Sequence, residues 1–103
     1  MTTQFTIVCG LHTNGHDVDA HQLILDLAAE AFPGGHTIRE SVGRWTLING
    51  DSVEEKTIEV VWLTEEPFDE AWPLVAGVAA DYKNGAFQEA VMVTHSEVNA
   101  TFV

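Results

Sequence analysis

Residues 49–63 read Asn-Gly-Asp-Ser-Val-Glu-Glu-Lys-Thr-Ile-Glu-Val-Val-Trp-Leu, and this stretch decides which folds the chain can adopt. Asn49-Gly50-Asp51 is typical of the tight turn that joins two antiparallel strands. Apolar and polar residues alternate after the turn, which predicts a strand from about Val53 to Leu63. Residues 36–48 read as the other arm, so the sequence predicts a β-hairpin in the middle of the chain.

The segment before this hairpin combines a strand with a helix. Gln4–His12 is apolar on both alternating faces, as expected of a central strand that is covered on two sides. After a turn-rich loop, Asp17 or Asp19 can cap a helix whose leucines recur at intervals of four. Phe32-Pro33-Gly34-Gly35 is expected to end that helix.

The segment after the hairpin repeats the combination in the opposite order. A second helix is predicted from near Asp69 to Lys83, with Pro73 close to its first turn. Residues 88–95 are predicted to form a fourth strand, and residues 98–103 could add a short edge strand. The order strand, helix, strand, strand, helix, strand predicts one α+β domain over residues 1–103, with a ferredoxin-like antiparallel sheet and both helices on one face.

The charge of the chain is strongly acidic. Sixteen acidic residues against four basic ones give a formal net charge of −12 at pH 7. This charge argues against direct binding to nucleic acid phosphates. Three interpretations stay open: a solvated acidic surface, an acidic decoy that imitates DNA for a basic protein, and a site for a positively charged small molecule.

Several features of the sequence favour a cytoplasmic location. No apolar run approaches the roughly 20 residues that cross a membrane. The first residues, Met1 to Phe5, lack the basic segment and apolar stretch of a secretion signal. Cys9 is the single cysteine and cannot form an internal disulfide, so we expect it to be a small buried hydrophobe in a reducing compartment.

Alternation within the predicted strands indicates which side chains share a face. Ile58 and Val60 are expected to face the helices, so Glu55 points to the open face of the sheet. In the fourth strand Val93 is expected in the core, which leaves Gln88 on the same open face as Glu55. With the first strand between them, these two side chains could contact opposite ends of a small ligand. The open face is apolar enough to suggest oligomerisation.

Over residues 5–103 the chain resembles the phage S-adenosylmethionine lyases. The resemblance lies in Glu54-Glu55-Lys56-Thr57 before an apolar strand, in Gln88-Glu89-Ala90-Val91-Met92-Val93, and in the aromatic residue of Gly43-Arg44-Trp45. That family has a trimeric, PII-like version of the ferredoxin-like fold, so the resemblance implies a homotrimer with sites between subunits. It also implies that Glu55 and Gln88 occupy the functional glutamate and glutamine positions. The family has a tyrosine, displaced by about one residue, where this chain has Trp45.

The resemblance implies a specific reaction on S-adenosylmethionine. The carboxylate of the substrate attacks its own γ-carbon and expels methylthioadenosine, which leaves homoserine lactone, and neither a metal nor a cofactor is required. Glu55 and Gln88 would be the catalytic residues, and Trp45, Glu54 and Tyr82 would bind the substrate. Whether Glu54 or Glu55 faces the ligand stays open. A phage protein with this activity would deplete the methyl donor that host restriction and methylation use.

A second resemblance is to a group of uncharacterised bacterial proteins. These share Phe-Pro-x-Gly after the first helix, Gly-x-Trp in the second strand, and Tyr-Lys followed by Phe-x-Gln-Glu-x-Val, here residues 82–91. No chemistry is established for that group. The main alternative to the lyase is therefore a non-enzymatic acidic anti-defence protein, a decoy or inhibitor that binds a basic host protein or a nucleotide-type ligand. A trimer that senses an adenosine compound without cleaving it is a third interpretation.

His12, His16 and His21 lie close in the sequence but do not predict a metal site. They are spread over a strand end, a loop and a helix start, with no recognised ligand spacing. We therefore expect no metal at these positions.

Overall fold

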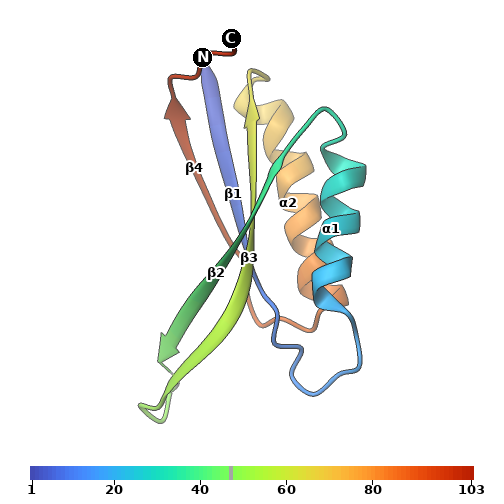
Figure 1. The fold of residues 1–103 in the computed structure, drawn as a ribbon, viewed down its shortest axis with the longest axis vertical. Helices are drawn as coiled ribbons and strands as arrows, with labels where there is room; N and C mark the ends of the chain where they lie inside the picture. The colour runs from blue at the N-terminus through green and yellow to red at the C-terminus, as the bar shows by residue number, and fades with distance from the viewer. Residues whose placement is uncertain (47) are drawn as a thin grey trace.

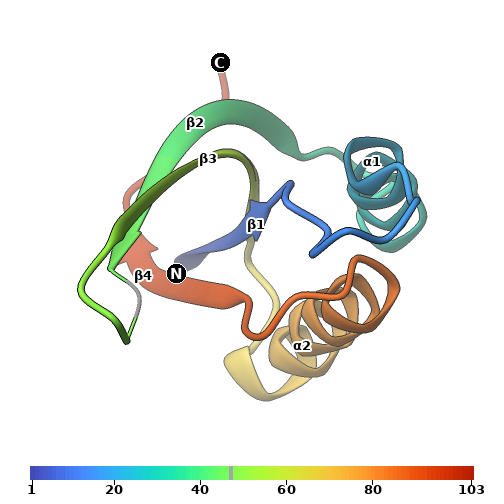
Figure 2. The ribbon, with the colours of Figure 1, turned by 90° about the horizontal axis from the view of Figure 1, so that it is seen from below.

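The computed structural model describes residues 1–46 and 48–103, and it has the predicted order of elements (Figure 1). The elements are β1 (Thr2–Gly10), α1 (Ala20–Ala31), β2 (Thr37–Thr46), β3 (Ser52–Thr64), α2 (Phe68–Gly85) and β4 (Met92–Val98). The four strands form one antiparallel sheet in the order β2-β3-β1-β4. Both helices cover the same face of that sheet (Figure 2). The prediction of a ferredoxin-like α+β fold is confirmed.

The β2–β3 hairpin is longer than the rest of the sheet. Gly50 has φ +89° in the turn between the strands, where glycine meets no steric penalty. β1 ends where Gly10 pairs with Thr57, so residues 52–56 of β3 pair with β2 alone. The hairpin therefore projects beyond the helices, at the end of the molecule where the β1–α1 and α2–β4 loops also lie (Figure 1). Residue 47 of the predicted second strand lies outside the described residues.

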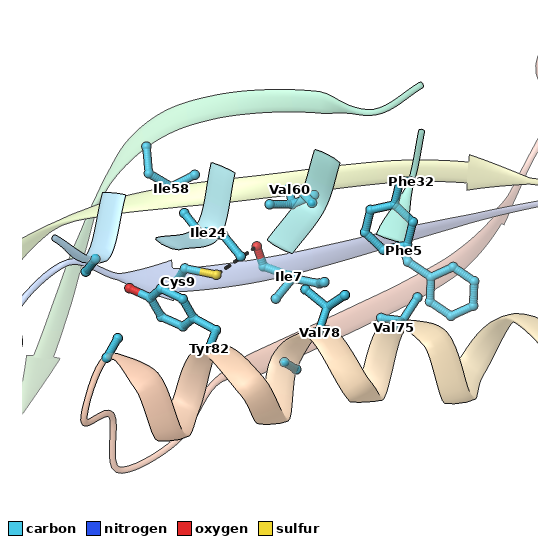
Figure 3. Close-up of a cluster of buried hydrophobic side chains, with 14 of the residues drawn as sticks. Phe5, Ile7, Cys9, Ile24, Phe32, Ile58, Val60, Val75, Val78 and Tyr82 are labelled. Carbon is cyan, nitrogen blue, oxygen red and sulfur yellow. Dashed lines mark hydrogen bonds between the residues drawn. The ribbon is translucent and has the colours of Figure 1, made fainter. Parts of the chain in front are cut away.

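The core lies between the sheet and the two helices (Figure 3). β1 contributes Phe5, Ile7 and Cys9, and β3 contributes Ile58 and Val60, all with at most 1% of their surface exposed. The helices add further buried side chains, among them Ile24, Ala28, Val75, Val78 and Tyr82. Cys9 is the buried hydrophobe that the sequence predicts, and burial raises the pKa of its thiol to about 12.

α2 begins at Phe68, within one residue of the predicted start, and Pro73 is its sixth residue, inside the helix just beyond the first turn. The start of β4 differs from the prediction. At the other end of α2, Phe87 has φ +56°, and the Gln88 N–H donates to the Lys83 carbonyl at 2.9 Å. This turn delays β4 until Met92, so Gln88 lies in the loop before the strand. Residues 99–103 belong to no strand.

β4 ends at Val98, three residues later than predicted, and the other boundaries follow the prediction within about two residues. β1 starts and ends two residues earlier than predicted. Beyond its last paired residue, Gly10, the Leu11 N–H still donates to the Lys56 carbonyl of β3. Of the two candidate caps of α1, Asp19 has that role, and its side chain accepts a hydrogen bond from the Gln22 N–H at 3.0 Å. Among the described residues, no helix combines the length and the apolar character needed to cross a membrane.

Candidate functional site

Glu55 lies at the point where β1 stops and the hairpin continues. It pairs with Gly43 on β2 and faces away from the helices, because the even-numbered residues Ile58 and Val60 occupy the core. Its carboxylate lies directly above Gly10, where a Cβ atom would come within 2.6 Å of the Glu55 Oε1. The glycine at the end of β1 therefore provides the space that the carboxylate occupies.

Both oxygens of the Glu55 carboxylate accept a hydrogen bond from the protein. The Trp45 Nε1–H donates to Oε1 at 2.8 Å, and the His12 backbone N–H donates to Oε2 at 3.2 Å. These two hydrogen bonds fix the orientation of the carboxylate. Since each oxygen has two lone pairs, the carboxylate can still accept hydrogen bonds from a ligand. The Trp45 side chain keeps 43% of its surface exposed beside this carboxylate.

Gln88 hydrogen-bonds to the backbone carbonyl of His12, the residue whose N–H donates to Glu55. The Gln88 Nε2 donates to the His12 carbonyl at 2.6 Å and to the Ala86 carbonyl at 3.0 Å. Both amide hydrogens are thus used, and the side-chain oxygen is the atom that can contact a ligand. His12 therefore joins the two predicted residues, with its N–H on Glu55 and its carbonyl on Gln88. The structure brings these side chains together through a loop rather than through a shared strand face.

The loops that carry this cluster are tied to each other. The Asn14 side chain donates to the Phe87 carbonyl at 2.5 Å. The His16 ring stacks on the Phe87 ring with centroids 3.6 Å apart and planes 5° from parallel. Asn14 and Phe87 both have positive φ, which is uncommon outside glycine and is maintained here by these contacts. Sequence reasoning missed this tie, as well as the roles of Gly10 and His12.

Tyr82 and Glu54, the other two predicted site residues, have different positions. Tyr82 is fully buried beside Cys9 (Figure 3), and its hydroxyl donates to the Gly10 carbonyl. Burial raises the pKa of Tyr82, and the charges of Cys9 and Glu55 raise it further. Tyr82 contacts the end of β1 from the helix side of the sheet, and its buried ring has no face that a ligand could reach in a single chain. Glu54 points to the opposite face of β3 from Glu55 and forms an exposed ion pair with Arg44 at 2.9 Å.

A separate groove lies near the hairpin. Its volume is about 470 Å³, and it is lined by Leu11, His21, Glu40, Ser41, Val42, Lys56, Thr57 and Ile58. Glu55, Trp45 and Gln88 do not line this groove, and all three side chains are partly exposed to solvent in a single chain. Among the described residues, no group of three or more His, Cys, Asp or Glu side chains could hold a metal ion.

Comparisons with known proteins give one family and a set of related folds. A family model described as "Protein of unknown function (DUF3574)" matches residues 13–102. No curated protein matches the chain. A phage SAM lyase in complex with S-methyl-5'-thioadenosine has a similar structure, with a TM-score of 0.74 and 16% sequence identity over 93% of this chain and 81% of that chain.

Two other solved structures also share the fold. The phage SAM lyase in its apo state has a TM-score of 0.71 and 16% identity, and the alignment covers 91% of this chain and 78% of that chain. A DUF3240 family protein from Shewanella baltica has a TM-score of 0.58 and 15% identity, over 100% of this chain and 99% of that chain. At such identities these likenesses show the fold alone.

Proposed function

This chain belongs to the DUF3574 family, whose function is unknown, and we propose that it binds S-adenosylmethionine and cleaves it to methylthioadenosine and homoserine lactone. The observation that carries the proposal is that Glu55 and Gln88 both hydrogen-bond to His12 while Trp45 hydrogen-bonds to Glu55. The fold that supports this cluster is shared with a phage SAM lyase, which was solved with S-methyl-5'-thioadenosine bound. The motifs that resemble that family in the sequence are the ones that supply these three side chains.

The proposed reaction takes place within the substrate. One oxygen of the substrate carboxylate forms a bond to the γ-carbon, and the bond between that carbon and the sulfonium sulfur breaks. The bonding electrons stay on sulfur, which gives neutral methylthioadenosine, while the lactone keeps the ammonium group. Atoms and charge balance without water, metal or an external base. The protein must therefore supply a folded substrate conformation and a partly desolvated carboxylate.

The cluster offers a group for each charged or polar part of this substrate. Glu55 is oriented by its two hydrogen bonds and can hold the substrate ammonium or the ribose hydroxyls. The free amide oxygen of Gln88 can accept a hydrogen bond from the other of these groups. The exposed face of Trp45 can contact the sulfonium, because a ring face attracts a cation. The acidic character of the whole chain favours the approach of a substrate with net positive charge.

The proposal includes a homotrimer with the sites between subunits. In one chain the cluster is open to water, and water would keep the substrate carboxylate solvated and unreactive. Exposed apolar side chains on the open face of the sheet, including Met92 at 51% and Leu63 at 37%, are suited to contact with other copies. A cytoplasmic lyase of phage origin would lower the host's supply of methyl donor.

The test is turnover by the purified protein. We expect mass spectrometry to detect methylthioadenosine and homoserine lactone in equal amounts after incubation with S-adenosylmethionine. Glu55→Gln keeps the shape of the side chain and removes its charge, so kcat should fall about 100-fold, as for the loss of one preorganised polar group. Glu30→Gln removes the same charge from the exposed surface of α1 and serves as the matched control.

Three results would decide the matter. Lactone formation that is lost in Glu55→Gln and kept in Glu30→Gln supports the lyase. Retention of S-adenosylmethionine or methylthioadenosine without turnover would refute the lyase and identify a ligand-sensing protein. Neither turnover nor binding at high protein concentration would refute the proposed site as well.

A further inference from the structure

An exposed aromatic cluster lies on the flank of α2 and the neighbouring strand. Phe68 and Trp72 are one helical turn apart, with 40% and 37% of their surfaces exposed. Their ring centroids are 5.8 Å apart and their planes are within 9° of parallel. His95 of β4 stands across both rings, with its centroid 4.9 Å from Phe68 and 6.4 Å from Trp72. The three rings form a corner in which Phe68 and Trp72 are nearly parallel and His95 is steeply inclined to both.

This corner is rigidly supported from below. The buried Phe5 ring stacks on Phe68 at 5.8 Å and on Trp62 at 5.9 Å. Phe5 has 1% of its surface exposed, so the outer rings rest on the main core. The cluster is therefore held in place before any ligand arrives, which lowers the entropic cost of binding.

The corner is distant from the site proposed above. The first turn of α2 and the end of β4 lie at the end of the molecule where both chain termini are found (Figure 1). The β2–β3 hairpin, which carries Glu55, and the α2–β4 loop, which carries Gln88, lie at the opposite end. The aromatic cluster therefore has no part in the proposed lyase chemistry.

Four acidic residues are sequence neighbours of the corner, in or just before the two elements that form it. Asp69 follows Phe68 in the first turn of α2, and Glu65 and Glu66 precede that turn. Glu97 lies two residues after His95, so it is on the same face of β4. All four carboxylates belong to exposed residues.

No lysine or arginine lies in the first turn of α2 or in β4, although the α-amino group of Met1 is at this end of the molecule, where Met1 and Glu97 line the same small hollow. Three of the chain's four basic residues, Arg39, Arg44 and Lys56, lie on the β2–β3 hairpin. The fourth, Lys83, lies in the last turn of α2. Among the described residues, the ion pairs are Arg39 with Glu59 and Arg44 with Glu54. Neither pair includes a carboxylate at the rim of the corner, so these carboxylates can meet a cation from another molecule.

We propose that this corner, formed by Phe68, Trp72 and His95 with Asp69 and Glu97 at its rim, binds an arginine-bearing segment of a partner protein. A guanidinium group is planar and stacks on aromatic faces, and its edge can donate hydrogen bonds to carboxylates. A lysine ammonium is more strongly hydrated and cannot match the parallel rings with a plane of its own. Nucleic acids and anionic lipid surfaces carry negative charge and would be repelled by the rim.

The probe for this proposal is the capped peptide acetyl-Ala-Arg-Ala-Arg-Ala-amide. It is titrated at low salt into the full chain while the indole N–H signals are followed by NMR, with Trp72→Leu used to assign the Trp72 signal. The Trp72 signal should shift with saturation. The matching lysine peptide should bind at least 3-fold more weakly. The citrulline peptide, which keeps the shape of arginine without its charge, should bind at least 10-fold more weakly.

Charge variants locate the binding surface. Asp69→Asn and Glu97→Gln should each weaken binding of the arginine peptide at least 3-fold. Glu30→Gln lowers the net charge equally at a distant exposed position on α1 and should leave binding unchanged. Equal weakening by Glu30→Gln, or equal binding of the lysine peptide, would refute the proposal in favour of unspecific charge attraction. A shift of the Trp72 signal on dilution without peptide would also refute it, because a second copy would then cover the corner.

Discussion

The space above Gly10 allows a direct test of how the site is built. In the Gly10→Ala variant the new Cβ would lie 2.6 Å from Glu55 Oε1 and 2.9 Å from both Cδ and Oε2. An ordinary van der Waals contact begins near 3.4 Å, so the carboxylate must move by about 0.8 Å or more. Such a movement pulls Glu55 away from the Trp45 indole and the His12 N–H at the same time.

The expected cost differs between stability and function. Glu55 is a flexible, partly exposed side chain, so it can swing aside and leave the strands paired. The two weakened hydrogen bonds contribute about 1 kcal/mol or less each to folding. A total near 1 kcal/mol corresponds to a fall in Tm of about 4–8 °C for a domain of this size. A catalytic group displaced by about 1 Å can lose about 100-fold in rate, so turnover should fall far more than stability.

The assay combines product formation with thermal unfolding. Gly10→Ala should retain the fold, lose a few degrees in Tm and lower kcat about 100-fold. Gly77→Ala is the matched control, because a Cβ at this exposed position of α2 meets no atom within 4 Å. It should keep full activity and gain up to about 1 kcal/mol of stability from better helix propensity. Gly43→Ala should lie between the two, since its Cβ would approach the Trp45 ring to 3.1 Å.

Two outcomes would contradict this reasoning. Wild-type turnover in Gly10→Ala would mean that the position of the Glu55 carboxylate does not control activity. Complete unfolding of Gly10→Ala would mean that glycine is required for the end of β1 to fold, and not only to leave space for the Glu55 carboxylate.

Three further predictions concern stability. Burial raises the pKa values of Cys9 and Tyr82, so these groups ionise at lower pH in the unfolded chain than in the folded chain. The free energy of unfolding should therefore fall as the pH rises above about 9, where Cys9 ionises in the unfolded chain. Urea titrations from pH 8 to 11 check this, and Cys9→Ala should make the free energy of unfolding depend less on pH. Asp19→Ala removes the cap that accepts from Gln22 and should cost about 1 kcal/mol, with Asp19→Asn retaining most of it, in the same titration at pH 7. Pro73→Ala returns a backbone N–H to the interior of α2 and should raise the Tm, because proline inside a helix costs up to about 3 kcal/mol; an unchanged or lower Tm would show that this position gains nothing from the N–H.

Local patterns were sufficient to predict the elements and their order. Asn49-Gly50-Asp51 needs only its own backbone to turn, as the positive φ of Gly50 shows. The alternation along β3 placed Ile58 and Val60 in the core without knowledge of their partners, because a strand repeats every two residues and one face must be buried. The helices followed from the same kind of short-range signal, including the cap at Asp19.

The start of β4 could not be read from local patterns. The run from Gln88 to Val93 has the propensity of a strand, yet Phe87 adopts a left-handed conformation just before it. The contacts that hold Phe87 come from Asn14 and His16, more than 70 residues earlier in the chain. Tertiary contacts therefore overrode the local preference and moved Gln88 into a loop.

The candidate site is in the same sense a product of the tertiary structure. The sequence singled out Glu55, Gln88 and Trp45 as side chains of the right type, but gave no sign that the His12 peptide would join them. The sequence also could not show that Tyr82 is buried beneath the site whereas Trp45 is exposed within it, because residue type alone does not determine burial. Periodicity determines which face of its own strand a side chain occupies, whereas the meeting of three segments at one carboxylate depends on how the sheet ends, and that is decided only when the whole chain has folded.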